Sequence, residues 1–95
     1  MKNKILIEDQ VVAFIQRQPP ETRRRLREVL HAVECGKKFP EPLEDELEGF
    51  YKLKMDRIRI IMQMNSGSEG PVLKAVFAER RRVVYELFGQ ILGLE

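Results

Sequence analysis

Hydrophobic and polar residues alternate along the middle of the chain, between Glu48 and Met64. The apolar register of this stretch consists of Tyr51, Leu53 and Met55 in its first half and of Ile58, Ile60, Met62 and Met64 in its second half. Side chains point to alternate faces of a strand, so the pattern predicts a β-hairpin with one face buried in the core. The opposite register contains Lys52, Lys54, Arg57, Arg59, Ile61 and Gln63. In an antiparallel pair, Lys52, Lys54 and Arg59 share the outer face, where we expect function.

The residues before Gly36 predict a strand followed by two helices. A short apolar run at 4–7 favours a strand, with a helix as the alternative. A helix then begins at Glu8 or Asp9 and ends before the two prolines at 19–20, because proline lacks an amide donor. Pro20 suits the first turn of the next helix, and Gly36 its end. The apolar stripe of that helix has the spacing i, i+3, i+4, i+7 and consists of Leu26, Val29, Leu30 and Val33.

The remaining segments complete an α+β fold. Residues 37–48 contain two prolines and several acids and predict an extended connection. Residues 65–71, NSGSEGP, predict a loop or wide turn, and residues 72–78 a third strand of the same sheet. A helix is expected over 79–92, with a ragged start or a short strand extension before it. The expected architecture is a small antiparallel sheet packed against an N-terminal helical hairpin, with a C-terminal helix.

Length and composition restrict the classes of protein that fit. A chain of 95 residues with 43% hydrophobic content predicts a single domain with one core. Neither a run of about 18 apolar residues nor the apolar part of a signal peptide is present, so we expect a cytoplasmic protein. Cys35 and His31 are each the sole residue of their type, which excludes an internal disulfide and a cysteine-based or histidine-pair metal site within one chain. We therefore expect no metal ion and no cofactor.

The net charge of +2 conceals a strong segregation of charges. Acidic residues crowd one short stretch and consist of Glu41, Glu44, Asp45, Glu46 and Glu48. Basic residues form two clusters, Arg23, Arg24, Arg25 and Arg27, and then Arg80, Arg81 and Arg82. Such clusters attract polyanions, although each is also compatible with a merely solvated surface.

The order of these elements resembles the RelE/ParE superfamily of toxins from type II toxin–antitoxin pairs. Two segments carry the resemblance, LEGFYKLKMDRIRIIMQM and VFAERRRVVYE. The positions that match the family are Leu47, Gly49, Tyr51, Lys52, Lys54, Arg59, Arg80, Arg81 and Tyr85. The resemblance implies a RelE-like fold over residues 1–95. It also implies a cognate antitoxin as partner, and as target either the ribosome with its messenger RNA (RelE-like) or DNA gyrase (ParE-like).

Metal-free cleavage of RNA requires a base for the ribose 2′-hydroxyl, cations for the phosphoryl group and a proton donor for the leaving oxygen. Clustered cations disfavour one another's charged forms, so a crowded lysine can act as the base, and the resemblance assigns this role to Lys52 and Lys54. Arg59 matches an arginine that holds the phosphate, and Arg81 or Arg80 one that stabilises the transition state. Tyr85 matches a tyrosine that stacks on the substrate nucleotide. Arg57 and Arg80 are the further candidates for contacts to RNA phosphate or base.

Each of these residues also has a plain structural interpretation. The lysines are compatible with a solvated sheet face, Arg59 with pairing to Glu48 or another acid, and Tyr85 with a place in the core. Glu41 lies in a PEPL segment that resembles the same segment of YoeB-like members, in which the glutamate is the general base. Those members end in a histidine–tyrosine pair, which this sequence lacks, so we expect Glu41 to be only a backup base. We expect packing or surface roles for His31 and Cys35.

Two departures from the family pattern bear on activity. Asp56 occupies a turn where many relatives carry glycine, and Glu79 lies beside the expected phosphate site, where it would repel substrate. A degenerate member that only binds its antitoxin is therefore a third hypothesis. The combination of Lys52, Lys54, Arg59 and Arg81 favours RNA as the target over gyrase.

Overall fold

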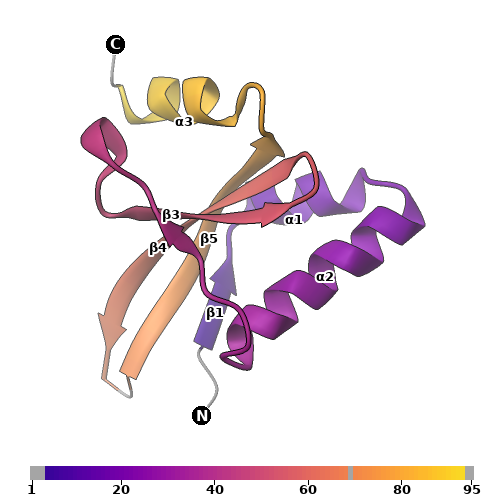
Figure 1. The fold of residues 1–95 in the computed structure, drawn as a ribbon, viewed down its shortest axis with the longest axis horizontal. Coiled ribbons are helices and arrows are strands. Elements are labelled where there is room, and N and C mark those ends of the chain that lie inside the picture. Colours follow the sequence, from indigo (N-terminus) through magenta and orange to yellow (C-terminus); the bar gives the residue numbers. More distant parts are fainter. Residues whose placement is uncertain (1–3, 69, 94–95) are drawn as a thin grey trace.

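The computed structural model describes residues 4–68 and 70–93, which fold around a five-stranded sheet (Figure 1). The strands are β1 (Lys4–Ile7), β2 (Glu41–Pro42), β3 (Phe50–Met55), β4 (Ile58–Gly67) and β5 (Gly70–Arg80). They lie in the order β1-β5-β4-β3-β2, and every neighbouring pair is antiparallel except β1 with β5. The helices are α1 (Asp9–Gln16), α2 (Pro20–Glu34) and α3 (Val84–Leu92), with a short 3-10 helix η1 (Asp45–Leu47). The predicted α+β architecture is confirmed, with one parallel edge strand that the sequence did not indicate.

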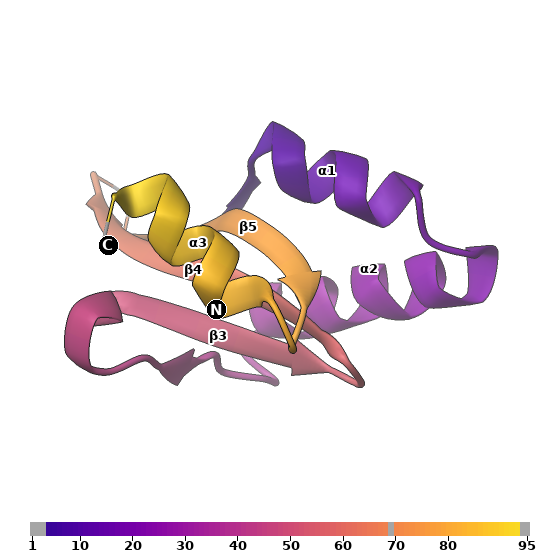
Figure 2. The same ribbon diagram turned by 90° about the horizontal axis from the view of Figure 1, so that it is seen from above.

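Helices α1 and α2 cover one face of the sheet as the predicted hairpin (Figure 2). The prolines between them act as expected, since α1 ends at Gln16 and α2 begins at Pro20. Their buried residues belong to one hydrophobic cluster, Val11, Phe14, Ile15, Leu26, Leu30 and Val33. This cluster, the first core, also contains the predicted apolar face of the β3–β4 hairpin, including Leu53 and Ile60.

Helix α3 covers part of the other face of the sheet, which the sequence predicted to be polar. Ile61, Phe77, Val84 and Phe88 form a second buried cluster there. The ring of Phe88 packs edge-to-face on Phe50, with centroids 5.0 Å apart, and lies 5.8 Å from that of Phe77. The C-terminal helix therefore packs on this sheet through one stripe, whereas its Ile91 is 65% exposed. No helix in residues 4–68 and 70–93 is long and apolar enough to cross a membrane.

A β-bulge in β5 changes which residues of this strand face each of the two cores. Ile61 lies opposite Phe77, but the next residue of β4, Met62, lies opposite Ala75, so Val76 is the extra residue. As a result Ala75 and Ala78 both belong to the first core, although strict alternation would place them on opposite faces. Val76 and Phe77, two consecutive residues, both contact the second core.

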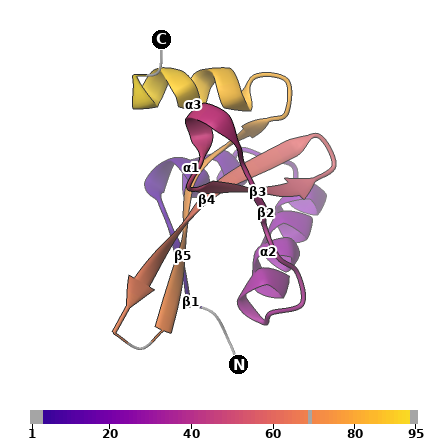
Figure 3. The same ribbon diagram turned by 60° about the vertical axis from the view of Figure 1, so that its left-hand side comes forward.

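The limits of the loop or wide turn predicted for 65–71 are wrong, since 65–67 and 70–71 belong to strands and only Ser68 is described as a turn residue. Strands β4 and β5 continue to Gly67 and Gly70, which lie opposite each other, so the hairpin forms a long arm that extends away from the helices (Figure 3). Glycine and serine have weak strand propensity, but pairing with an adjacent strand overrides that local preference. The final helix is confirmed together with the predicted strand extension before it, because β5 extends to Arg80 and α3 begins at Val84.

Candidate nucleic-acid interface

The predicted cations of the hairpin lie on one face of the sheet, the face that α3 partly covers. Lys54 of β3 lies opposite Arg59 of β4, and Arg59 lies opposite Glu79 of β5. Lys52 lies opposite Ile61, in a cross-strand pair further from the hairpin turn. We call the three residues Lys52, Lys54 and Arg59 the cation row. The shared face predicted for these residues is confirmed, whereas their chemical roles remain predictions.

The ammonium group of Lys54 pairs with an acid. Its Nζ lies 3.2 Å from Oε1 of Glu41, which edge strand β2 places opposite Lys52. Nearby, Nζ of Lys38 donates to the backbone oxygen of Lys54 at 3.4 Å. The immediate partner of Lys54 is thus a carboxylate and not the further cation assumed from the sequence. Glu41 instead lies within contact distance of the site that the resemblance predicted.

Arg59 is turned back onto its own hairpin turn. Its Nη1 donates to the backbone oxygens of Asp56 at 2.8 Å and of Ile58 at 2.9 Å. Within residues 4–68 and 70–93, Arg59 forms no ion pair, so the alternative of pairing with Glu48 or another acid is not found there. The Glu79 carboxylate opposite it accepts a hydrogen bond from the backbone N–H of Arg80 at 2.9 Å. Arg59 therefore keeps Nη2 and Nε for an incoming anion, next to one negative charge.

A second group of cations lies at the turn end of the hairpin, where β5 finishes. Arg57, Arg80, Arg81 and Arg82 line a hollow of about 450 Å³. The backbone N–H of Arg81 donates to the carbonyl oxygen of Arg57 at 2.7 Å, which ties the end of β5 to the turn. We call these four residues the arginine cluster. Since none of them has an ion-pair partner among the described residues, the cluster carries an unneutralised positive field that attracts anions.

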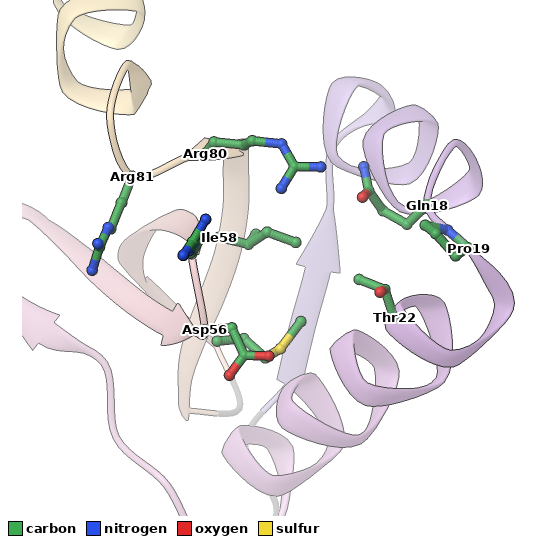
Figure 4. Close-up of a pocket in the computed structure, with 9 residues that line it drawn as sticks. Gln18, Pro19, Thr22, Asp56, Ile58, Arg80 and Arg81 are labelled. Atoms are coloured by element: carbon green, nitrogen blue, oxygen red, sulfur yellow. The ribbon is translucent and has the colours of Figure 1, made fainter.

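Arg80 and Arg81 point to opposite sides of the end of β5 (Figure 4). Arg80 lies opposite Ile58, on the sheet face of the first core, and its guanidinium points towards Gln18 and Thr22 of the helical hairpin. Arg81 points away from those helices. The sequence left open which of the two arginines belongs with the cation row. This divergence favours Arg81.

Tyr85 lies in the first turn of α3 and is half-buried against the second core. The ring of Tyr85 therefore contacts the core, as its structural interpretation predicted, and its hydroxyl has no hydrogen-bond partner among the described residues.

His31 and Cys35 lie at the C-terminal end of α2, where Sγ of Cys35 is 3.4 Å from Nε2 of His31. Both lie apart from the cation row in sequence and on a different element. No metal-binding group of three or more His, Cys, Asp or Glu side chains occurs in the described part of the chain.

Two supporting contacts of the site were not apparent from the sequence. Gln10 of α1 donates from Nε2 to the backbone oxygen of Ala78 and accepts at Oε1 from its N–H, both at 2.8 Å. Arg25 of α2 forms a hydrogen-bonded ion pair with Asp56 in the hairpin turn. Hydrogen bonding to Arg25 lowers the pKa of Asp56 below its usual value. Neither contact has a sequence signal, because both join residues that are far apart in the chain.

No protein-family model and no curated protein matches this sequence. The fold nevertheless matches solved structures. A RelBE toxin–antitoxin complex from Mycobacterium tuberculosis gives a TM-score of 0.67 at 13% identity, over 85% of this chain and 93% of that chain. The archaeal RelE–RelB complex from Pyrococcus horikoshii gives 0.60 at 20% identity, over 85% and 97%. An arginine-to-alanine double mutant of the Escherichia coli toxin RelE, in the free state, gives 0.66 at 13% identity, over 99% and 98%. The chain therefore has the fold of the RelE/ParE toxins.

Proposed function

We propose that this protein is the toxin of a type II toxin–antitoxin pair and that it cleaves messenger RNA on the ribosome without a metal ion. The observation that carries the proposal is the convergence of the cation row and the arginine cluster at one end of the β3–β4 hairpin, on a RelE-like fold. An unneutralised group of guanidinium ions suits the phosphates of RNA, because each planar fork binds two phosphate oxygens. Such a toxin acts in the cytoplasm, where translating ribosomes are.

The chemistry assigns one role to each group. A lysine of the cation row, Lys52 or Lys54, takes the proton of the ribose 2′-hydroxyl, whose oxygen then attacks the adjacent phosphorus. Arg59 and Arg81 stabilise the charge that develops on the phosphoryl oxygens. The 5′ oxygen leaves with a proton supplied by a cationic side chain, and Tyr85 stacks on the neighbouring base. Glu41, whose carboxylate lies 3.2 Å from Nζ of Lys54, is the alternative base that the YoeB-like resemblance suggests.

A cognate antitoxin is the expected protein partner. The matched structure from Mycobacterium tuberculosis is a toxin–antitoxin complex, and that from Pyrococcus horikoshii is a RelE–RelB complex. An antitoxin that covers the cation row would compete directly with RNA for the same charges.

The position of Glu79 supports the alternative hypotheses, in which this protein does not cleave RNA. It places a negative charge directly opposite Arg59, where a phosphate would bind. A ParE-like gyrase poison, or a family member that only binds its antitoxin, does not require phosphate at this position. Replacing Glu79 by glutamine therefore separates the hypotheses, since it strengthens RNA cleavage only if the carboxylate opposes phosphate.

The test is primer extension on a defined messenger RNA in a purified translation system, with and without ribosomes. We expect ribosome-dependent cuts by the wild-type protein, a loss of about 10²- to 10³-fold in Arg81→Ala and of about 10²- to 10⁴-fold in Lys52→Ala. Glu79→Gln should cut faster than wild type. The control is Arg27→Ala, which removes an exposed arginine of α2 outside the cation row and the arginine cluster.

The result that rejects the endonuclease is a folded wild-type protein that leaves messenger RNA intact on active ribosomes. A gyrase cleavage assay then distinguishes the alternatives. Double-strand breaks in DNA indicate a ParE-like toxin. Intact DNA, together with normal growth on strong expression, indicates a protein that only binds its antitoxin.

A further inference from the structure

A second hollow adjoins the arginine cluster, with which it shares Arg57, Arg80 and Arg81, and extends onto the side of the sheet that α1 and α2 cover. It has a volume of about 620 Å³ and lies between the corner that joins α1 to α2 and the turn of the β3–β4 hairpin (Figure 4). Ile58 and Arg80 contribute to its wall, and both lie on the sheet face of the first core. The volume falls within the range of about 300–1,000 Å³ that is usual for small-molecule sites.

The charges of this hollow favour an anion. Arg57, Arg80 and Arg81 all line it, and none has an ion-pair partner among the described residues. Its one acidic residue, Asp56, is hydrogen-bonded to Arg25 from outside the lining, so its charge is compensated. Arg80 points across the hollow towards Gln18 and is the guanidinium that an entering phosphate would contact.

The rest of the wall suits a flat, partly polar group. Met55 and Ile58 expose little of their surface, 6% and 3%, and give the hollow an apolar floor. Thr22 has no hydrogen-bond partner for its hydroxyl in the part of the chain that the structure describes. Gln18 donates from Nε2 to the backbone oxygen of Phe14 at 3.1 Å, which leaves Oε1 as a fixed acceptor. A hydroxyl and a carbonyl oxygen above an apolar floor offer the contacts that a nucleobase requires.

We propose that this hollow binds one nucleotide. The phosphate pairs with Arg80, the base lies on Met55 and Ile58, and its polar edge contacts Thr22 and Gln18. The ligand is either a free nucleoside monophosphate or one nucleotide of an RNA strand that continues around the end of β5 from the cation row. The inference goes beyond the proposed function, because binding here requires no cleavage, and a binding assay measures it independently.

The test is isothermal titration calorimetry of the purified full chain with AMP, adenosine, inorganic phosphate, a short single-stranded RNA and a glutamate-rich peptide. The variants are Arg80→Gln, which removes the charge, and Thr22→Val, which removes the hydroxyl while it keeps the shape. Arg27→Gln is the matched control, since it removes the same charge from an exposed site on α2 outside this hollow. Melting temperatures show whether each variant is folded.

Two results support the inference. AMP binds more tightly than adenosine or phosphate, Arg80→Gln weakens it by about tenfold or more, the loss expected for a charge-assisted hydrogen bond, and Thr22→Val, outside the arginine cluster, weakens it as well. Alternatively only the RNA strand binds, and both Arg80→Gln and Thr22→Val weaken it, which identifies the strand as the source. In both cases Arg27→Gln leaves the affinity unchanged.

Three results overturn the inference. Inorganic phosphate binds as tightly as AMP and RNA, the glutamate-rich peptide binds more tightly than RNA, or Arg80→Gln and Arg27→Gln have equal effects. If one of these occurs while the wild-type protein still cuts messenger RNA on ribosomes, the nucleotide site is rejected and the proposed endonuclease stands.

Discussion

Gln10 continues the hydrogen bonding of the sheet where β1 has already ended. The last residue of β1, Ile7, lies opposite Ala75, and Glu8 donates its backbone N–H to the Ala75 oxygen at 2.9 Å. Further along β5, the amide group of Gln10 takes the place of a strand and binds both the N–H and the carbonyl of Ala78 at 2.8 Å. Ala78 is fully buried, so its N–H and carbonyl depend on Gln10 for these bonds.

The substitution Gln10→Met removes both bonds and keeps the length of the side chain. Two neutral hydrogen bonds contribute about 1 kcal/mol each, and an unpaired buried polar group costs about 1–3 kcal/mol. Because the two estimates overlap in what they count, we expect a loss of about 2–4 kcal/mol in the free energy of unfolding. For a domain of this size that corresponds to a fall of roughly 10–25 °C in Tm.

Urea denaturation followed by circular dichroism measures this change. The matched control is Gln16→Met on the same helix, where the side chain is exposed and has no hydrogen bond in the described structure. Hydrogen exchange of the Ala78 amide measures the local effect. In Gln10→Met its exchange rate should rise by more than the fall in the free energy of global unfolding accounts for. Equal stabilities of Gln10→Met and Gln16→Met would refute the reasoning.

Two further predictions concern the turn and the C-terminal helix. Arg25 lowers the pKa of Asp56, so this pair stabilises the fold above the usual Asp pKa of 3.8 and stops doing so as the pH falls through the lower folded value. The substitution Asp56→Asn suits the left-handed φ of 54° at this position. The urea midpoint of this variant should therefore lie below that of wild type at pH 7, and the two midpoints should converge in acid. A difference that stays constant with pH would contradict the linkage. Phe88→Ala should cost about 3–5 kcal/mol in unfolding free energy because it empties the second core, whereas Ile91→Ala, at a 65% exposed position of the same helix, should change little. Equal losses for these two alanine variants would show that α3 does not pack through Phe88.

The central hairpin was predictable because its information is local. Alternation alone gave the faces of β3 and β4, and it placed Lys52, Lys54 and Arg59 together, as the strand register confirms. The prolines and the apolar stripes likewise gave the limits of α1 and α2 to within a few residues. In these elements local propensity, periodicity and tertiary packing all favour the same structure.

The features that escaped prediction depend on contacts between distant segments. The bulge at Val76 changes the phase of β5, and no local pattern marks where a phase change occurs. The contact of Glu41 with Lys54 requires β2 to pair with β3, although β2 has only two residues. Residues 65–71 contain asparagine, serine, glycine and proline, all of which favour turns, yet most of them are paired in the long arm of β4 and β5. Opposite orientations of Arg80 and Arg81 follow from strand geometry, but only once the end of β5 is known.

The parallel pairing of β1 with β5 makes the order of synthesis important. Lys4 lies in the first strand to be synthesised, whereas its partner Val72 lies in the last. Until then β1 has no neighbour, and the apolar sides of α1 and α2 lack Ala75 and Ala78. Contacts of such large sequence separation slow folding, because the connecting chain must be ordered before they form. The arginine cluster is therefore assembled only when β5 closes the sheet, so a nascent chain does not display this positive surface while it is still being made.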